Sequence, residues 1–323
     1  MRKAIAREIT RENLSSAVAV IDCADPEDRA GWTRITVRAA ALNQHDLWSM
    51  RGVGTTPADF PLGLCSDVAG STPDGRAVLA HSLVSDPAFS GGELLDPKRK
   101  MLAEVSGGGA AQYVMVPDRN VVDKPESLSF EQAAGIPTAW LTAYRMLFVA
   151  GDAKPGETVL IQGAGGGVAS AAITLASSAG LRVWVTTRDE VRAKKAETIG
   201  ASETFESGSR LPARVDLVLD TVGAATWDHS MRSVKPGGTV VVSGATTGGK
   251  VTLDLNRVFL PHVRIHGSSL GTVADLQAVV SYCAVKGIAP VIDSTYPLDR
   301  AADAVARLES GQAFGKVIIA PWQ

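Results

Sequence analysis

A stretch of 24 residues without a charged side chain, Thr158–Leu181, constrains the fold of this 323-residue chain more than any other feature. Its length alone would allow a transmembrane helix. The stretch begins with a β-branched run, continues with the glycine-rich segment 163–167 and ends in an alanine-rich segment. This order predicts a buried strand, a tight turn and a helix, so we expect the stretch to lie inside a soluble domain.

The stretch is part of a regular alternation of strand and helix patterns. Strands are predicted at 158–164, 182–187, 203–206, 215–220 and 239–243, with helices at 168–178, 189–199 and 224–234. Such alternation is typical of βαβ units, whose right-handed crossovers give a doubly wound parallel sheet. The first 120 residues differ and predict a barrel-like β domain, with short strands at 1–7, 34–41, 76–81 and 111–117.

The glycine-rich turn predicts a dinucleotide site, because it follows a strand and opens a helix. Backbone N–H groups at a helix N-terminus can meet a pyrophosphate there, provided that no side chain blocks the approach. The residues expected to bind are Gly165, Gly166, Gly167 and Val168. A turn that binds nothing is the competing interpretation, and the surrounding βαβ series makes it the weaker one.

The end of the second predicted strand favours NADPH over NADH. NAD sites place an acidic residue there to bind the ribose 2′-hydroxyl, whereas this strand ends at Thr187 and Arg188. Arg192 lies four residues beyond Arg188, so two guanidiniums, together with the threonine hydroxyls at the strand end (Thr187 among the residues expected to bind), can face one 2′-phosphate. Asp189 keeps NAD open as an alternative, because it would supply the acid if the strand ran longer.

Composition excludes several classes of function. The 32 basic and 34 acidic residues nearly balance, which predicts no broad basic field for nucleic acid or anionic lipid. The basic run Lys98–Lys100 is expected to be a solvated loop. Three cysteines without a CxxC pair predict no disulfide framework, and Met1–Thr10 has no apolar signal core. We therefore expect a cytoplasmic protein with no membrane partner.

Several ordered motifs resemble the medium-chain dehydrogenase/reductase superfamily, in its zinc-independent quinone oxidoreductase branch. Besides the glycine turn, they are Ala41–Leu47, Ser66–Gly70, Leu141–Tyr144, Asp220–Gly223, Lys235–Gly238 and Gly315–Ile318. The resemblance implies an α/β protein in which a Rossmann doubly wound parallel sheet is inserted into a GroES-like β-barrel catalytic domain. The catalytic domain would comprise residues 1–122 and 268–323, and the Rossmann dinucleotide-binding domain residues 123–267. Dimers in this family usually pair Rossmann edge strands, so a homodimer is expected, with Arg264–Leu270 near the interface.

The resemblance also assigns residues to the site. It implies that Asn43, Trp48, Ser66 and Thr138 surround the nicotinamide and the substrate. Gly244 and Leu270 would lie beside the nicotinamide ribose, and Lys316 near the closing C-terminal segment. Gly166 and Val168 would hold the pyrophosphate, with Arg188 and Arg192 at the 2′-phosphate.

The residues at the zinc positions of related enzymes favour chemistry without a metal. Zinc-dependent relatives have a Cys and a His-Glu pair where this chain has Asn43 and Ser66-Asp67. Asn and Ser do not supply the thiolate or imidazole ligands that zinc prefers. A displaced site built from His45, Cys65 and Asp67 is the alternative.

Hydride transfer without a metal needs an electron-poor acceptor and a donor for the developing oxyanion, which suits quinones and α,β-unsaturated carbonyls. Some relatives carry tyrosines where this chain has Trp48 and Gly54, so Asn43 or solvent must provide the proton. Asp46 is expected to cap a helix, and Asp220 to accept hydrogen bonds at a strand end. Two alternatives stay open: an NADPH-binding sensor or structural protein with little catalysis, and an enoyl reductase acting on acyl chains.

Overall fold

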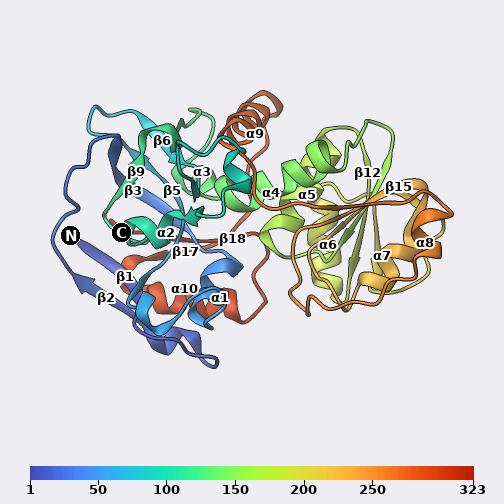
Figure 1. Ribbon diagram of the computed structural model, residues 1–323, viewed down its shortest axis with the longest axis horizontal. Helices are drawn as coiled ribbons and strands as arrows, with labels where there is room; N and C mark the ends of the chain where they lie inside the picture. The colour runs from blue at the N-terminus through green and yellow to red at the C-terminus, as the bar shows by residue number, and fades with distance from the viewer. The chain divides into compact units, whose positions relative to one another are not determined.

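The computed structural model describes all 323 residues, Met1–Gln323, and the chain forms two compact units. Unit 1 comprises Met1–Ala139 and Gly271–Gln323, and unit 2 comprises Trp140–Leu270, so unit 2 is inserted into the chain of unit 1 (Figure 1). Residues 268–270, which the resemblance assigned to the catalytic domain, belong to unit 2. Segment 123–139, which it assigned to the Rossmann domain, belongs to unit 1. The reason is that helix α3 (Phe130–Ala134) packs against the main sheet of that unit.

Unit 2 is built on a six-stranded parallel sheet in the order β13-β12-β11-β14-β15-β16. Its strands are β11 (Thr158–Gln162), β12 (Arg182–Thr187), β13 (Glu203–Glu206), β14 (Val215–Asp220), β15 (Val234–Val242) and β16 (Arg264–Gly267). Its α-helices are α4 (Leu141–Tyr144), α5 (Gly167–Ser178), α6 (Glu190–Thr198), α7 (Trp227–Ser233) and α8 (Asn256–Phe259). The strand order reverses direction between β11 and β14, as in doubly wound nucleotide-binding sheets.

Most of the predicted strands and helices of unit 2 are confirmed within a few residues. The uncharged stretch forms β11, the glycine-rich turn and α5, and no helix in the protein is long and apolar enough to cross a bilayer. One strand differs from the prediction. β15 begins at Val234 instead of 239, and Pro236–Gly238 lies inside it as an irregularity in the pairing with β14 rather than as a turn before it.

Unit 1 contains two main sheets, a three-stranded antiparallel sheet and a seven-stranded mixed sheet in which β17 and β18 pair in parallel. The three-stranded sheet consists of β2 (Val18–Asp22), β1 (Arg2–Ala6) and β4 (Leu62–Gly63). The seven-stranded sheet has the order β10 (Val121–Asp123), β6 (Ala77–Ala80), β5 (Asp67–Ser71), β3 (Trp32–Ala41), β18 (Lys316–Ala320), β17 (Ile292–Pro297), with β9 (Tyr113–Pro117) also paired to β3. Strands β7 (Leu83–Val84) and β8 (Lys100–Met101) form a small pair, and the other helices are α1 (Gln44–Met50), α2 (Leu102–Ser106), α9 (Val273–Lys286) and α10 (Ala301–Glu309).

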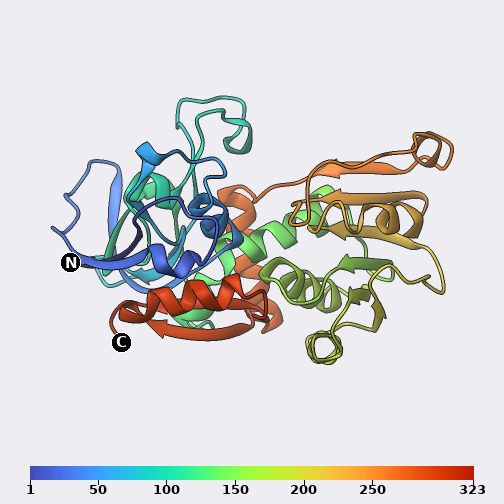
Figure 2. The same cartoon turned by 90° about the horizontal axis from the view of Figure 1, so that it is seen from below.

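The position of β18 beside β3 determines where polar side chains meet in unit 1. This C-terminal strand lies between the N-terminal strand β3 and the edge strand β17 (Figure 1; Figure 2 gives the view from below). Ala41 at the end of β3 pairs with Ile318 of β18 on one side and with Asp67 of β5 on the other. The end of β3 and the starts of β5 and β18 are thereby brought to one place.

Strand β5 reaches this place only because Gly70 has no side chain. A Cβ at Gly70 would lie 2.1 Å from the carbonyl oxygen of Thr36 on β3. We predict that Gly70→Ala lowers the free energy of unfolding by about 3 kcal/mol, because the backbone of β3 must move. Gly249→Ala is the control, since its Cβ would have only an ordinary 3.7 Å contact with Ala245. Denaturant unfolding measures both, and equal stabilities for the two variants would contradict the prediction.

Candidate functional site

The glycine-rich turn of unit 2, which we call the phosphate turn (Gly163–Val168), lies at the carboxyl end of β11. The N–H of Gly163 donates to the carbonyl oxygen of Thr186 at 3.1 Å, which holds the turn beside the end of β12. Gly163 has a φ of +89°, a conformation that favours glycine. Helix α5 starts at Gly167 with Gly166 as its N-cap. The first N–H groups of the helix, which have no partners within it, thus belong to the turn.

The front of the phosphate turn has room for a phosphate group. A Cβ built on Gly166 would meet no protein atom within 4 Å. The turn lies where the strand order reverses, and doubly wound sheets bind ligands at the carboxyl ends of strands at this point. Gly244 follows β15 at the same edge of the sheet, and Leu270, with a φ of +49°, is the last residue of unit 2. The geometry therefore fits a dinucleotide.

The two arginines predicted at the 2′-phosphate differ in their surroundings. Arg192 is half-buried, and its guanidinium lies against Gly165, where a Cβ would be 3.1 Å from both Cζ and Nη1. Arg188 is exposed. Asp189 is the N-cap of α6, because its carboxylate accepts hydrogen bonds from the N–H groups of Val191 (2.8 Å) and Arg192 (3.1 Å). β12 ends at Thr187, so Asp189 lies beyond the strand.

A buried polar network beneath the phosphate turn has no counterpart in the sequence motifs. The Thr186 hydroxyl donates to Gln162 Oε1 (2.7 Å), and Gln162 Nε2 donates to His229 Nδ1 (2.9 Å). His229 Nε2 lies 2.9 Å from the carbonyl oxygen of Ser209, and since a carbonyl oxygen only accepts, this nitrogen is the donor. The network links the ends of β11 and β12 to helix α7.

Asp220, at the end of β14, has the role that the sequence predicted. It is fully buried and accepts hydrogen bonds from the N–H groups of Val222 and Gly223, both at 2.9 Å. The hydroxyls of Thr226 and Ser230 also donate to it. With every partner a donor, Asp220 serves as a strand-end acceptor.

Unit 1 contains a second polar group, which we call the Asp67 cluster: Asp67, Asn43, Ser82, Thr138 and Lys316. Asp67 is completely buried. Its Oδ2 accepts from Asn43 Nδ2 (2.9 Å) and lies 3.4 Å from Lys316 Nζ. Its Oδ1 accepts from the hydroxyl of Ser82 (2.5 Å) and from that of Thr138. Ser82 was not among the predicted site residues, because no sequence motif marks it.

Lys316 completes the cluster as a buried cation. Its side chain is 3% exposed, and besides Asp67 its ammonium donates to the carbonyl oxygen of Leu42 (2.9 Å) and to Asn43 Oδ1. The three hydrogens of the ammonium thus have three acceptors within unit 1. The resemblance placed Lys316 with the cofactor-binding residues, whereas the structure places it with Asn43 and Asp67.

The other predicted residues of unit 1 lie on elements next to the cluster. Asn43 is the N-cap of α1, and the half-buried Trp48 lies on this helix. Asp46 accepts from the N–H groups of Asn43 and Cys65, both at 2.8 Å, and so caps α1 as predicted. Burial raises the pKa of Asp46, although these two hydrogen bonds lower it. The buried Ser66 Oγ accepts from the N–H of Ala103 (3.2 Å).

These residues do not fit a zinc ion. The Lys316 ammonium already bonds the Asn43 and Asp67 oxygens, and a second cation there would be repelled. Burial raises the pKa of the Cys65 thiol well above its ordinary value, which disfavours the thiolate that zinc requires. His45 lies 3.7 Å from Glu104. No three His, Cys, Asp or Glu side chains in the chain are arranged to hold a metal.

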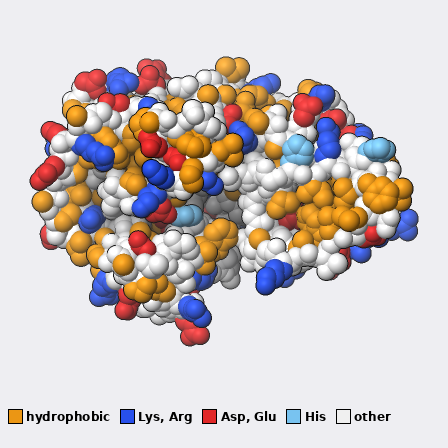
Figure 3. All heavy atoms as spheres, viewed as in Figure 1, with side chains coloured by type: hydrophobic (Ala, Val, Ile, Leu, Met, Phe, Trp, Pro, Cys, Tyr) orange, Lys and Arg blue, Asp and Glu red, His pale blue; other side chains and the backbone are white.

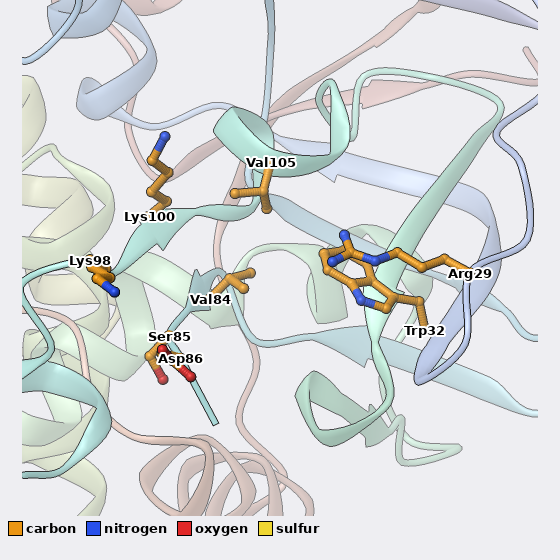
Figure 4. Close-up of a pocket in the computed structure, with 8 residues that line it drawn as sticks. All are labelled: Arg29, Trp32, Val84, Ser85, Asp86, Lys98, Lys100 and Val105. Atoms are coloured by element: carbon orange, nitrogen blue, oxygen red, sulfur yellow. The ribbon is translucent and has the colours of Figure 1, made fainter. Parts of the chain in front are cut away.

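A separate cavity of about 240 Å³ lies in unit 1, away from the predicted site residues. Figure 4 shows Arg29 stacked on Trp32 at one side of it, with a 4.3 Å separation between the guanidinium carbon and the ring centroid. Lys98 and Lys100 extend from the opposite side, so this basic run borders a cavity instead of forming only a solvated loop. None of the residues in the Asp67 cluster lines the cavity.

Comparison with known proteins identifies relatives over nearly the whole chain. A family model described as zinc-binding dehydrogenase matches residues 196–319. A 2-methylene-furan-3-one reductase of Solanum lycopersicum is 34% identical, covering 95% of this chain and 75% of that protein. The quinone oxidoreductase of Homo sapiens is 27% identical, covering 92% of each chain. Among the curated relatives, the aligned part spans from 64% to 95% of the relative's own length.

Solved structures match the fold of this chain. A crystal structure described as an NAD-dependent alcohol dehydrogenase superposes with a TM-score of 0.91 at 30% identity, over 99% of both chains. The names of these relatives include zinc-binding, NAD-dependent and quinone- or enone-reducing proteins. These named proteins thus differ from one another in metal and in cofactor.

The buried pair of Lys316 and Asp67 leads to a prediction about stability. Lys316→Met leaves a buried carboxylate without its cation, and we expect the free energy of unfolding to fall by about 3–5 kcal/mol. The double variant Lys316→Met/Asp67→Asn removes both charges and should recover at least half of this loss. Lys235→Met is the control, because the Lys235–Asp216 pair is exposed at its lysine and should contribute about 1 kcal/mol or less. Chemical denaturation measures all three, and a double variant no more stable than Lys316→Met would contradict the prediction.

Proposed function

The chain belongs to the medium-chain dehydrogenase/reductase superfamily, and on this basis we propose that it reduces quinones or α,β-unsaturated carbonyls with NADPH and without a metal. The observation that carries the proposal is the Asp67 cluster, in which the Lys316 ammonium bonds to Asn43 and Asp67. These are two of the positions at which zinc-dependent relatives bind their metal. A fixed ammonium supplies positive charge there, but it has no open coordination position for an alcohol.

The adenosine half of the cofactor is assigned to unit 2. The backbone of Gly166–Val168 binds the pyrophosphate, because the turn is open at Gly166 and the helix N-terminus favours an anion. Arg188 and Arg192 bind the 2′-phosphate. Asp189 is occupied as the cap of α6, which supports NADPH over NADH.

Bound NADPH supplies a hydride from its nicotinamide ring to the acceptor. The acceptor must be electrophilic without a Lewis acid, which describes a quinone or a conjugated enone. The residues of unit 1 then stabilise the negative charge that forms on the acceptor oxygen. The name of the tomato relative, a 2-methylene-furan-3-one reductase, supports the enone class.

We assign the hydrogen bond to the acceptor oxygen to Ser66, because Asn43 has other partners. The Asn43 amide nitrogen faces Asp67 Oδ2 (2.9 Å) and the carbonyl oxygen of Ala41 (3.5 Å). Asn43 thus holds Asp67 and Lys316 in place. Ser66 Oγ accepts a hydrogen bond from Ala103, and its own hydrogen remains available as a donor. Trp48 offers a flat apolar wall for a conjugated substrate.

Turnover without a metal is the direct test of this function. We expect NADPH oxidation with a simple quinone or enone, and a rate that changes less than about twofold after dialysis against a chelator, since no step uses a metal ion. Absorbance at the NADPH band measures the rate. Loss of activity on chelation with recovery on adding zinc would contradict metal independence. Tight NADPH binding without turnover across quinones, enones and enoyl thioesters would favour the sensor alternative, and turnover of enoyl thioesters alone would favour the enoyl reductase.

We further propose that the chain forms a homodimer through strand β16 of unit 2. This edge strand has exposed side chains along its whole length. Hydrophobic side chains gather on the surface of unit 2 around α8 (Figure 3), and the exposed apolar residues of this region are Val251, Leu255, Phe259, Leu260 and Ile265. An exposed edge strand next to a cluster of exposed apolar side chains is rare in a monomer, because it invites pairing with another strand. A second copy of the same edge would satisfy both the backbone and the apolar side chains.

Ile265→Lys tests the dimer. We expect the dimer dissociation constant to rise about thirtyfold or more, because the substitution buries a charge in the centre of the interface. Val285→Lys is the control, since Val285 is 84% exposed on α9 of unit 1. Sedimentation equilibrium gives the mass of each variant. A wild-type chain that is monomeric at micromolar concentration, or an Ile265→Lys variant that dimerises like the control, would refute this interface.

A further inference from the structure

We propose that Gly165 determines cofactor specificity: because it has no side chain, the Arg192 guanidinium can lie on the phosphate turn, where it favours NADPH over NADH. This inference rests on the proposed use of NADPH. Gly165 is the residue that lets Arg192 reach the 2′-phosphate. Its role therefore differs from that of its neighbour Gly166.

The guanidinium of Arg192 lies directly against Gly165. A Cβ built on Gly165 would lie 3.1 Å from Cζ, 3.1 Å from Nη1 and 3.2 Å from Nε of Arg192. Three atoms of the planar guanidinium are thus equidistant from one point, so the plane faces the glycine. Carbon atoms in ordinary contact stay about 3.5–4.0 Å apart. A Cβ at Gly165 would therefore require the guanidinium to shift by a few tenths of an ångström from its place on the turn.

The requirement for glycine at 165 does not come from the backbone. Gly163 has a positive φ, but Gly165 and Gly166 do not. Alanine would be unstrained at both positions. The two differ only in what surrounds them, since Gly165 faces Arg192 and Gly166 faces open space. The adjacent glycines form a matched pair for experiment.

Arg192 is held at both of its ends. Its backbone N–H donates to the Asp189 cap at 3.1 Å, and its guanidinium rests on Gly165. Arg188 precedes the cap and is exposed. A side chain that is already placed loses less conformational entropy when it binds a ligand. Arg192 is therefore expected to contribute more than Arg188 to binding of the 2′-phosphate.

The position of the contact explains why it affects specificity. The phosphate turn follows β11, and the Gly163 N–H bonds the Thr186 carbonyl oxygen, so the turn and the end of β12 lie side by side. A dinucleotide on this turn has its adenosine ribose at the end of β12. The guanidinium is then next to the 2′-position, which carries a phosphate in NADPH and a hydroxyl in NADH. A planar guanidinium suits a phosphate dianion and gains little from a hydroxyl.

The test compares dissociation constants for NADPH and NADH, measured by cofactor fluorescence on the full chain. Gly165→Ala should weaken NADPH binding about fivefold, because the shifted guanidinium loses its alignment with the 2′-phosphate, with NADH changed less than about twofold. Arg192→Ala should weaken NADPH about tenfold, and Arg188→Ala less than that. Gly166→Ala should weaken both cofactors equally, because its Cβ enters the space of the pyrophosphate. Thermal melting confirms that each variant is folded.

A double variant shows whether Gly165 acts through Arg192. Gly165→Ala/Arg192→Ala should have the same NADPH-to-NADH ratio as Arg192→Ala alone, since no guanidinium remains to be displaced. An equal loss of both cofactors in Gly165→Ala, or a selectivity loss that persists in the double variant, would overturn the inference.

The same measurements separate this inference from the proposed function. If wild type prefers NADPH and Arg192→Ala removes the preference, but Gly165→Ala keeps it, only the role of Gly165 is refuted. If wild type binds NADPH and NADH equally and Arg192→Ala changes neither, the proposed NADPH preference is refuted, and the inference falls with it.

Discussion

The ion pair between Lys316 and Asp67 is the interaction on which the arrangement of unit 1 depends. The two residues are 249 positions apart, and both are almost completely buried. Burying two charges is costly unless each has further hydrogen bonds. Here Asp67 accepts from Asn43, Ser82 and Thr138, and Lys316 donates to Leu42 and Asn43. The pair therefore fixes the positions of strands β3, β5 and β18 and of helix α1 at once.

Unit 2 has a buried carboxylate, Asp220, whose hydrogen-bond donors are all neutral groups. Gln162, Thr186 and His229 form a further set of hydrogen bonds beneath the phosphate turn. In both units, the buried polar side chains at the strand ends find their hydrogen-bond partners within the protein. The groups that remain available to a ligand are then few and fixed, which is the preorganisation that binding and hydride transfer require.

The sequence was most informative where local periodicity and glycine chemistry decide the structure. It predicted most strands of unit 2, the phosphate turn, the capping role of Asp46 and the role of Asp220 as a strand-end acceptor. It could not predict that Lys316 belongs with Asp67, because their contact depends on β18 pairing with β3 across most of the chain. Ser82 was missed because no sequence motif marks it. Asp189 stayed ambiguous, since a shift of two residues in the end of β12 would have changed its role.

The order in which the chain leaves the ribosome gives the insertion of unit 2 a further meaning. Unit 2 is contiguous and can fold as soon as Leu270 has emerged, whereas unit 1 must wait for β18 to fill the gap between β3 and β17. Lys316 follows Ala139, the end of the first part of unit 1, by 177 residues. At usual rates of synthesis, this delay is roughly 10 to 35 seconds. During this time Asp67 has no cation, and its strand has an open edge. The nascent chain is thus a finished nucleotide-binding unit joined to a half-built catalytic one, and this half-built unit is the part that chaperones would have to protect.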